Sequence, residues 1–166
     1  MTRAPFFFTY VTYEKGDLVG YLMAIACLTP HVITIALFAF LISLSNTRLK
    51  KQVGLLLLGQ FLNEALNVVL KRLIREPRPI NERIDYAMPS SHSQYAGYIA
   101  VVGWKILRKN PAIHSVIRIL GLIACVGVYV VVPFSRYYLD YHDARQIAVG
   151  LGIGSLFGVF WRKILF

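Results

Sequence analysis

Charged residues are scarce in this chain of 166 residues. They make up 16% of it, whereas hydrophobic residues make up 57%. A soluble globular domain carries about 25% charged residues, so this composition excludes an ordinary soluble domain and predicts a polytopic membrane protein. Acidic residues are the scarcest charged type, because eight Asp and Glu accompany 18 Lys and Arg, which leaves a net charge of +10.

Cysteine is also scarce, and nucleic-acid motifs are absent from the sequence. Cys27 and Cys125 each lie inside an apolar run, where cysteine behaves as a small hydrophobe. We therefore expect no disulfide, no metal site and no cofactor. The basic residues lie at the ends of apolar runs and form no surface stripe, so the charge favours a membrane and a phosphate over nucleic acid as partners.

Five apolar segments predict an all-α transmembrane bundle of about five to six helices within one domain, residues 1–166. Each is close to the roughly 20 residues that cross a bilayer, and they are expected at 18–44, 53–74, 89–107, 113–132 and 142–164. The first predicts either one tilted helix kinked at Pro30 or a short interfacial helix followed by a span. Pro133 is expected to end the fourth helix. The last segment carries glycines that suit close helix packing, at positions 150, 152, 154 and 158.

Residues 1–16 are rich in aromatic side chains and predict an interfacial arm. Phe and Tyr settle at the level of the lipid headgroups, and five of them stand in this stretch, at positions 6, 7, 8, 10 and 13.

An antiparallel bundle brings distant polar residues to one side of the membrane. The end of the second segment, the start of the third, the end of the fourth and the start of the fifth share that side, so we expect convergence of Lys71, Arg78, Ser90, His92, Arg136 and His142. Nine Lys and Arg are expected on each side. Three of those on the site side are expected to bind phosphate, so six other basic residues remain there, against nine on the opposite side. The positive-inside rule then predicts that the site lies outside the cytoplasm.

The converging cations indicate an anion site. Arg78 stands between two prolines and offers a planar fork to phosphate oxygens, whereas Lys71 offers a point charge. Arg136 is expected to reach the same site from the other loop. Any one of these cations alone is more often an interfacial anchor; it is their convergence with two histidines that favours phosphate binding.

A helix start and two histidines supply the remaining chemistry. Ser90 and Ser91 begin the third segment, where free backbone N–H groups and the helix dipole favour an anion. His92 and His142 have an ordinary pKa near 6.5 and suit the roles of acid or nucleophile. His31 and His114 have no partner in the sequence, and we interpret them as interfacial residues.

Glu64 stands in the middle of a predicted span, where an acidic side chain is costly. It belongs to a helically spaced polar stripe with Gln60, Asn67 and Lys71. Two interpretations are open: Glu64 and Asn67 position Lys71, or Glu64 forms an interhelical pair that stabilises the bundle.

Three motifs together resemble the signature of the type-2 phosphatidic acid phosphatase superfamily: Lys71-x6-Arg78-Pro79, Pro89-Ser90-Ser91-His92 and Ser135-Arg136-x5-His142. More narrowly, the segments YEKGDLVGYL, LNEALNVVLKRLIREPRP and AMPSSHSQ are similar to the dolichyl diphosphate phosphatases of the endoplasmic reticulum. This resemblance implies metal-independent hydrolysis of dolichyl diphosphate to dolichyl phosphate, which recycles the glycan carrier lipid for N-glycosylation, at a site facing the lumen.

The resemblance also implies residue roles. His142 would attack the terminal phosphorus and form a phosphohistidine, and His92 would protonate the leaving oxygen. The phosphate oxygens would be bound by Lys71, Arg78, Ser90, Ser91 and Arg136.

Two positions depart from the superfamily pattern, because Ser91 replaces a usual Gly and Gln146 replaces a usual Asp. The amide oxygen of Gln146 is expected to orient His142 without supplying a negative charge, and Asp140 and Asp143 are nearby carboxylates. The alternatives are a phosphatase for undecaprenyl diphosphate or phosphatidate, and a lipid-phosphate binder without turnover. The oligomeric state is open.

Overall fold

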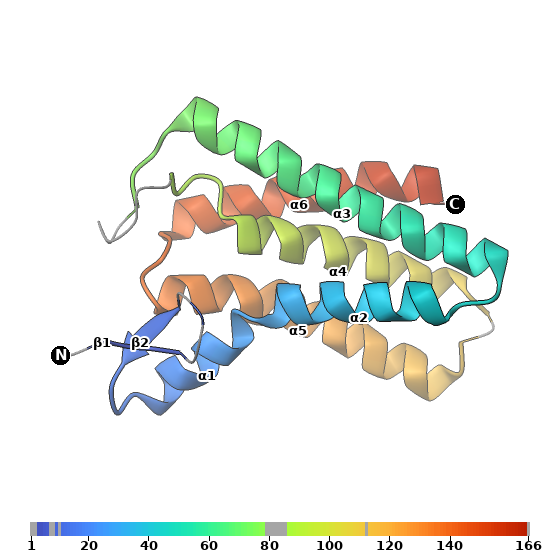
Figure 1. Ribbon diagram of the computed structural model, residues 1–166, viewed down its shortest axis with the longest axis horizontal. Coiled ribbons are helices and arrows are strands. Elements are labelled where there is room, and N and C mark those ends of the chain that lie inside the picture. The colour runs from blue at the N-terminus through green and yellow to red at the C-terminus, as the bar shows by residue number, and fades with distance from the viewer. Residues whose placement is uncertain (1–2, 7–8, 10, 79–85, 112, 166) are drawn as a thin grey trace.

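The computed structural model describes residues 3–6, 9, 11–78, 86–111 and 113–165. Within them it shows six helices and one two-stranded antiparallel sheet (Figure 1). The elements are β1 (Arg3–Pro5), β2 (Thr12–Glu14), α1 (Leu18–Ala26), α2 (Thr29–Ser43), α3 (Thr47–Ile74), α4 (Ser91–Lys109), α5 (Ser115–Tyr138) and α6 (Ala144–Leu165). The predicted helical bundle is therefore confirmed, with the small sheet as an element that the sequence reasoning did not anticipate.

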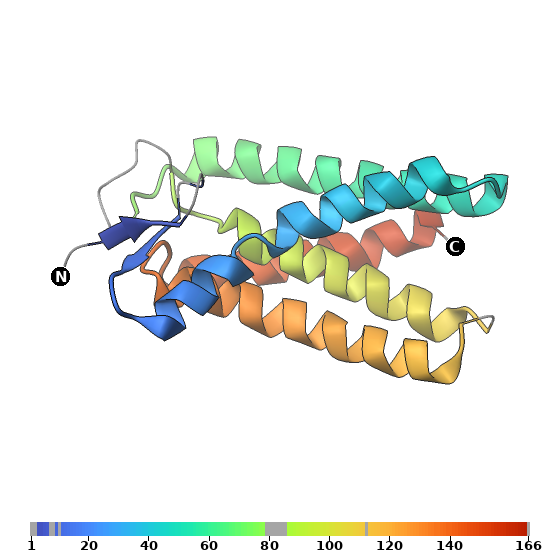
Figure 2. The ribbon, with the colours of Figure 1, turned by 60° about the horizontal axis from the view of Figure 1, so that its bottom comes forward.

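Four helical segments are long and apolar enough to cross a membrane. They are Leu18–Ser43, which combines α1 and α2, and the helices α3, α5 and α6. α4 is more polar and packs against α3, α5 and α6, and it lies between α3 and α5 in both ribbon views (Figures 1 and 2). The protein is thus a multi-pass membrane protein with a shielded, partly polar central helix.

The first apolar segment consists of two helices, α1 and α2, separated at residues 27–28. Pro30 is the second residue of α2, a position where its missing N–H group has no helical partner to lose. Of the two predicted arrangements, the structure shows the short helix followed by a longer one. The break also brings Cys27 into the interior, where its side chain is 1% exposed.

Two helix boundaries differ from the prediction. α3 begins at Thr47 and not near residue 53, because the side chain of Asn46 caps it by accepting a hydrogen bond from the N–H of Leu49 at 3.1 Å. Pro133 does not end α5, which continues to Tyr138. Proline is tolerated inside membrane helices where neighbouring groups satisfy the backbone, so a proline inside an apolar segment does not by itself end the helix.

The N-terminal segment is not a simple interfacial arm. Phe6 is 4% exposed, and its ring packs edge-on against Tyr13 and Tyr21 with centroid distances of 6.4 and 5.3 Å. The ring of Phe6 is therefore packed within the protein, and the interfacial arm stays a prediction; Phe7, Phe8 and Tyr10 lie outside the described residues. The hydroxyl of Tyr141 accepts a hydrogen bond from the N–H of Thr12 at 2.8 Å and thereby ties β2 to the segment between α5 and α6.

Glycines bring α6 close to α4. Of the four glycines in α6 for which close packing was predicted, three show it. A Cβ atom at Gly150 would lie 2.6 Å from the carbonyl oxygen of Ser90, and one at Gly158 would lie 3.2 Å from the carbonyl oxygen of Tyr98. Gly154 packs as tightly against the backbone of Gln94. The prediction is wrong for Gly152, where an added Cβ would meet open space.

The bundle has two ends of different character. The end that carries the small sheet contains the segment after α3, the start of α4, the end of α5 and the start of α6 (Figure 1); we call it the site end. The opposite end contains the α2–α3 turn, the α4–α5 turn and the end of α6. The predicted antiparallel arrangement is confirmed, because consecutive spans of similar length return the chain to the same two surfaces.

Candidate active site

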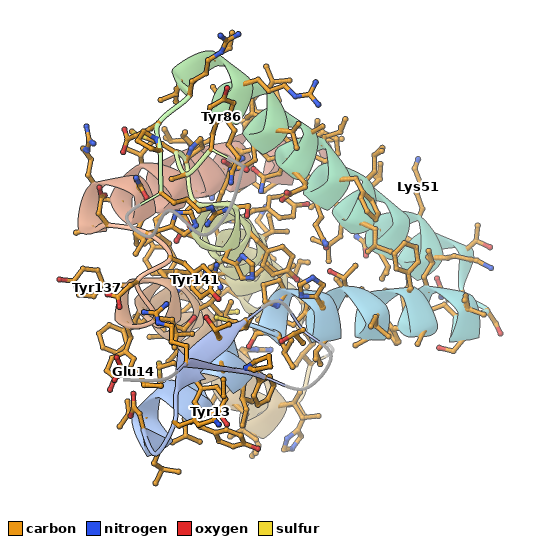
Figure 3. All side chains as sticks on the ribbon, turned by 60° about the vertical axis from the view of Figure 1, so that its left-hand side comes forward. Tyr13, Glu14, Lys51, Tyr86, Tyr137 and Tyr141 are labelled. Carbon is orange, nitrogen blue, oxygen red and sulfur yellow. The ribbon has the colours of Figure 1, made fainter. Side chains whose placement is uncertain are left out.

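Four helix termini bring the predicted residues together at the site end. Arg78 follows α3, Ser90 caps α4, Arg136 lies in the last turn of α5, and His142 precedes α6. Figure 3 views this end more directly, with Tyr86, Tyr137 and Tyr141 on it and Lys51 extending from the distant part of α3. The predicted convergence of motifs that are far apart in sequence is therefore what the fold shows.

His142 is held between Gln146 and Arg78, one at each ring nitrogen. Its side chain is 2% exposed, Nδ1 lies 3.1 Å from Oε1 of Gln146, and Nε2 lies 3.4 Å from Nη1 of Arg78. An amide oxygen only accepts hydrogen bonds, so Nδ1 carries the proton and donates. The lone pair of Nε2 then faces the guanidinium of Arg78, where a phosphate would lie.

The surroundings of His142 favour its neutral form. Burial of the ring, followed by the positive charges of Arg136 and Arg78, lowers the pKa of His142 to about 3. A charged imidazolium would be desolvated and repelled by these cations. The neutral form of His142 therefore predominates at physiological pH, and a bound phosphate dianion would offset the repulsion.

Gln146 reaches His142 as predicted, although a different local structure places it there. His142 lies before α6, so the two residues do not share a helix face. Asp143 caps the helix by accepting from the N–H of Gln146 at 2.8 Å, and Oε1 of Gln146 accepts from the N–H of Asp143 at 3.3 Å. This reciprocal pair is a capping box, so Asp143 orients Gln146 and is not turned away from it.

Arg136 is almost fully buried, with 4% of its surface exposed. Its guanidinium carbon lies 4.1 Å above the centre of the Tyr141 ring, and Nη1 donates to Sγ of Cys27 at 3.2 Å. Its Nε is buried without a hydrogen-bond partner among the described residues. Sequence reasoning missed both neighbours: Cys27 was interpreted only as a small hydrophobe, and no sequence pattern marked Tyr141.

Lys71 and Arg78 lie at the mouth of the site and are partly buried. Nζ of Lys71 donates to the carbonyl of Tyr86 at 2.8 Å, and Nη1 of Arg78 donates to the carbonyl of Tyr141 at 3.4 Å. These backbone contacts hold both cations near His142. Pro79, the last residue of the first motif, lies outside the described residues.

Ser90 caps α4, as the sequence predicted. It is fully buried, and its hydroxyl accepts hydrogen bonds from the N–H of Ser93 at 3.5 Å and from the hydroxyl of Ser93 at 3.0 Å. The N–H of Ser90 donates to the carbonyl of Gln146 at 3.2 Å, which links this cap to the helix that follows His142. Ser91 is the first residue of α4 and is partly exposed, so its N–H belongs to the free helix start that suits an anion.

His92 lies in the first turn of α4, close enough to Arg136 and His142 to interact with them electrostatically. The ring centroid of His31 lies 6.3 Å from that of His92. His31 is exposed, so its interfacial interpretation stays a prediction, but the fold brings it near His92. No periodicity or motif in the sequence indicates this pairing.

Asn67 supports the start of α4 from α3. It is 1% exposed, and its Nδ2 donates to the carbonyl of Pro89 at 3.2 Å and to Oε1 of Gln94 at 2.8 Å. Nε2 of Gln94 donates in turn to Oδ1 of Asn63 at 3.0 Å. A buried polar network thus joins α3 to α4 directly beneath the Pro-Ser-Ser-His motif, and Gln94 is a member that the sequence reasoning did not single out.

Glu64 differs from its polar neighbours on α3. The buried polar stripe follows Gln60, Asn63 and Asn67, whereas Glu64 is exposed on the surface of the helix. It lies within electrostatic range of Lys71 and His31. In the part of the chain that the structure describes, Glu64 forms no ion pair within 4.0 Å, so a direct interhelical salt bridge is not observed.

The donor set at this end suits an anion and not a cation. Among the described residues, no group of three or more His, Cys, Asp or Glu is arranged to hold a metal ion. The converging groups are instead two histidines, three basic side chains and the start of a helix. Such a set can bind phosphate oxygens, supply a nitrogen nucleophile and transfer a proton.

Comparison with known proteins places this fold and this set of residues in a family of membrane phosphatases. The profile of the PAP2 superfamily matches residues 52–166, and the chain belongs to that superfamily, as the three motifs indicated.

Two similar proteins are described as dolichyldiphosphatases, and a similar crystal structure is that of another PAP2-type phosphatase. The dolichyldiphosphatase of Saccharomyces cerevisiae is 30% identical over 172 residues, which cover 93% of this chain and 67% of that protein. Human dolichyldiphosphatase 1 is 30% identical over 169 residues, covering 95% and 69% respectively. A crystal structure of a transmembrane PAP2-type phosphatidylglycerolphosphate phosphatase from Bacillus subtilis superimposes with a TM-score of 0.75 at 21% identity, covering 90% of this chain and 78% of that one. This last likeness shows the fold.

Proposed function

We propose that this protein hydrolyses dolichyl diphosphate to dolichyl phosphate and inorganic phosphate. The observation that carries the proposal is the arrangement of His142, whose Nδ1 is held by Gln146 while Nε2 faces Arg78. The substrate class is supported by relatives that match nearly the whole chain and are described as dolichyldiphosphatases.

The first step forms a phosphohistidine. The lone pair of His142 Nε2 forms a bond to the terminal phosphorus while the bond from that phosphorus to the bridging oxygen breaks. His92 protonates the bridging oxygen, which leaves as part of dolichyl phosphate. The phosphate oxygens, which carry the developing charge, are bound by Lys71, Arg78, Arg136, the hydroxyl of Ser90, and the N–H and hydroxyl of Ser91.

Water completes the reaction in a second step. His92, now neutral, accepts a proton as the water oxygen attacks phosphorus, the bond between phosphorus and Nε2 breaks, and phosphate is released. His142 returns to its neutral form, the form that its buried and cationic surroundings favour. The residues of this chain therefore suffice for both steps in the proposed mechanism.

We further propose that Asn67 and Glu64 support the site at two levels. Asn67 holds Pro89 and thereby the start of α4. Glu64 acts on Lys71 and His31 through their charges, which keeps Lys71 directed away from the lipid. Replacing Asn67 with Ala is expected to lower turnover more than replacing Glu64 with Gln, and equal effects in a phosphate-release assay would contradict this order.

The proposed location is the endoplasmic reticulum membrane, with the site facing the lumen and the product returning to N-glycosylation. The supporting observations are the description of the relatives and the charge distribution: five described basic residues lie outside the phosphate site at the site end, against nine at the opposite end. A membrane-impermeant thiol reagent should label Lys51→Cys from the cytoplasmic side in sealed vesicles, with both native cysteines replaced. Labelling from the lumenal side would invert the proposed orientation.

The deciding experiment is phosphate release by the purified protein in EDTA. Dolichyl diphosphate, undecaprenyl diphosphate and phosphatidate are supplied in parallel, and the highest kcat/KM is expected for dolichyl diphosphate. His142→Ala should abolish release, and labelled phosphate should be trapped on wild-type protein alone. Equal trapping in His142→Ala would refute the assigned nucleophile, whereas binding without any trapping would indicate a lipid-phosphate binder.

A further inference from the structure

Glu76 has no role in the three sequence motifs, yet its carboxylate lies within the site. It follows α3, two residues before Arg78, and its side chain is 19% exposed. Oε1 of Glu76 accepts a hydrogen bond from Nε2 of Gln146 at 2.7 Å and another from Nη2 of Arg145 at 2.9 Å. A carboxylate is thus connected to the ring of His142 through a single amide group.

The hydrogen bonds along this connection have only one consistent direction. A carboxylate accepts and cannot donate when ionised, so the Gln146 amide must direct its nitrogen towards Glu76 and its oxygen towards His142. The N–H of Asp143, which contacts the same amide oxygen at 3.3 Å, requires the same orientation. Because this amide oxygen can only accept, the proton of His142 is on Nδ1. Nε2 is then unprotonated, and its lone pair is the one that would attack phosphorus.

The backbone around Glu76 holds it in place. Its carbonyl accepts a hydrogen bond from the N–H of Ala87 at 2.8 Å, which closes the polar segment between α3 and α4 onto it. The carbonyl of Pro77, the next residue, lies 3.5 Å from Nε2 of Gln146. Two adjacent residues of the segment after α3 therefore contact the same amide, and the segment reaches α6 at this point.

We propose that Glu76 is a positioning residue for the reaction and acts through Gln146. It holds His142 with Nδ1 protonated, and it supplies the negative charge that the superfamily usually obtains from an Asp at position 146. The inference rests on the proposed function. His142 gains positive charge as the bond from Nε2 to phosphorus forms, and a carboxylate two hydrogen bonds away stabilises that charge in a site from which water is largely excluded.

The contact with Arg145 does not explain why Glu76 is placed here. The side chain of Arg145 is 68% exposed, and an ion pair with one partner in water contributes little to stability. The bond to Gln146 is the buried one, because Gln146 is 1% exposed. The structure therefore allows the two contacts of Glu76 to be tested separately.

The first test compares Glu76→Gln with Arg145→Gln in the phosphate-release assay. Gln at position 76 keeps the side-chain length and an oxygen that accepts from Gln146, but it removes the charge. We expect kcat to fall about 10- to 100-fold, by analogy with the loss seen when a carboxylate that orients a metal-bound histidine is removed, with KM unchanged. Arg145→Gln should retain the wild-type kcat. Equal kcat values for the two variants and the wild type would overturn the proposal.

A paired exchange distinguishes charge supply from a merely structural role. In Glu76→Gln combined with Gln146→Glu, a carboxylate contacts His142 directly and an amide at position 76 donates to it, so the chain of hydrogen bonds is rebuilt in the same direction. We expect this double variant to recover most of the kcat lost in Glu76→Gln. Failure to recover it, with an unchanged midpoint of thermal unfolding, would show that Glu76 does not act through its charge.

The tautomer of His142 provides a readout that does not depend on turnover. In histidine-selective ¹⁵N NMR spectra, wild-type protein should show the signature of a protonated Nδ1 for His142, assigned by its loss in His142→Gln. Glu76→Ala should convert this signal to a mixture of tautomers, and an unchanged signal would overturn the positioning role. An inactive wild-type protein with the expected spectra would refute the proposed function alone.

Discussion

The two ends of the bundle carry the same kinds of basic side chain in opposite environments. At the opposite end, Arg48, Lys51 and Arg108 are exposed in or beside short polar turns. At the site end, Arg136 is 4% exposed and lies against Tyr141 and Cys27. The exposed side chains at the opposite end can extend into the headgroup region and water. The guanidinium of Arg136 is not hydrated in this way and instead contacts an aromatic ring and a sulfur atom, with a histidine nearby.

This difference is what we expect between an interfacial anchor and a cation that binds phosphate, the role proposed for Arg136. A basic residue at a helix end costs little when its side chain reaches water. Burying the same charge is costly unless other groups compensate for the lost hydration. Arg136 retains a buried Nε without a partner in the described part of the chain, and a phosphate oxygen is the group that would satisfy it. Substitutions at the two ends test this contrast.

The largest effect is expected from removing a buried cation. Arg136→Ala should lower kcat/KM for dolichyl diphosphate by about 10²- to 10³-fold, the loss typical of one group that stabilises a transition-state oxyanion. Arg108→Ala, at the exposed opposite end, should leave kcat/KM unchanged. Arg136→Lys keeps the charge but not the planar group above Tyr141, so it should recover only part of the activity. If Arg108→Ala and Arg136→Ala lowered kcat/KM by the same factor at equal thermal stability, the two ends would not differ in their contribution to activity.

A smaller effect is expected from widening the contact between α4 and α6. Gly150→Ala places a Cβ atom 2.6 Å from the carbonyl oxygen of Ser90, so the helices must move apart at the site end, at a cost of about 1–3 kcal/mol. Because Ser90 begins the phosphate-binding turn, activity should fall with stability. Both are measured on purified protein, by unfolding midpoint and phosphate release.

Two other glycines of α6 serve as controls for this substitution. Gly158→Ala requires a shift of only a few tenths of an ångström, because its Cβ atom would lie 3.2 Å from the nearest atom, and it lies farther from the site. Its unfolding midpoint should fall less than that of Gly150→Ala, and its activity should be retained. Gly152→Ala meets open space and should not destabilise the protein. An equal loss of stability in all three variants would contradict this account of the packing.

The smallest effect concerns pH. The pKa of His142 is about 3 in the folded protein and near 6.5 in an unfolded chain, so the unfolded state binds a proton first as the pH falls. The contribution of His142 to stability is therefore fully present above pH 6.5 and is lost as the pH falls towards 3, with a slope of at most about 1.4 kcal/mol per pH unit. Unfolding midpoints measured between pH 7 and pH 4.5 should follow this trend.

The same measurement compares one histidine from each end. His142→Gln should flatten the dependence of the unfolding midpoint on pH, whereas His114→Gln, at the exposed turn before α5, should leave it as in the wild type. Parallel curves for the wild type and His142→Gln would show that the buried site at this end does not disfavour protonation of the histidine.

Much of the bundle was predictable because membrane thickness limits the length of each helix. Segments of nearly constant length force the chain to alternate between two surfaces, so the positions of Lys71, Arg78, Ser90, Arg136 and His142 in their segments predicted that they would meet. Local rules were less reliable at helix ends. Pro133 predicted a helix end, but α5 continues through it to Tyr138. The basic residues after Asn46 were expected in a loop, but they belong to α3, which the side chain of Asn46 caps.

The residues that the sequence reasoning missed share one property. Cys27, Glu76 and Tyr141 belong to no helical stripe and to no recognised catalytic role, and each acts on a site residue from a different segment of the chain. Cys27 contacts Arg136 across 109 positions, and Glu76 contacts Gln146 across 70. Contacts of this kind leave no periodic signal, because they depend on how the helix ends are placed relative to one another.

The class of the protein and the groups that could bind and attack a phosphate were predictable from the sequence, because hydrophobicity, segment length and residue chemistry are local properties. The burial of Arg136, the protonation of His142 on Nδ1 and the position of Glu76 beside Gln146 come from the tertiary structure. Those outcomes depend on desolvation and on the direction of hydrogen bonds, and both arise only when distant segments exclude water from a shared space.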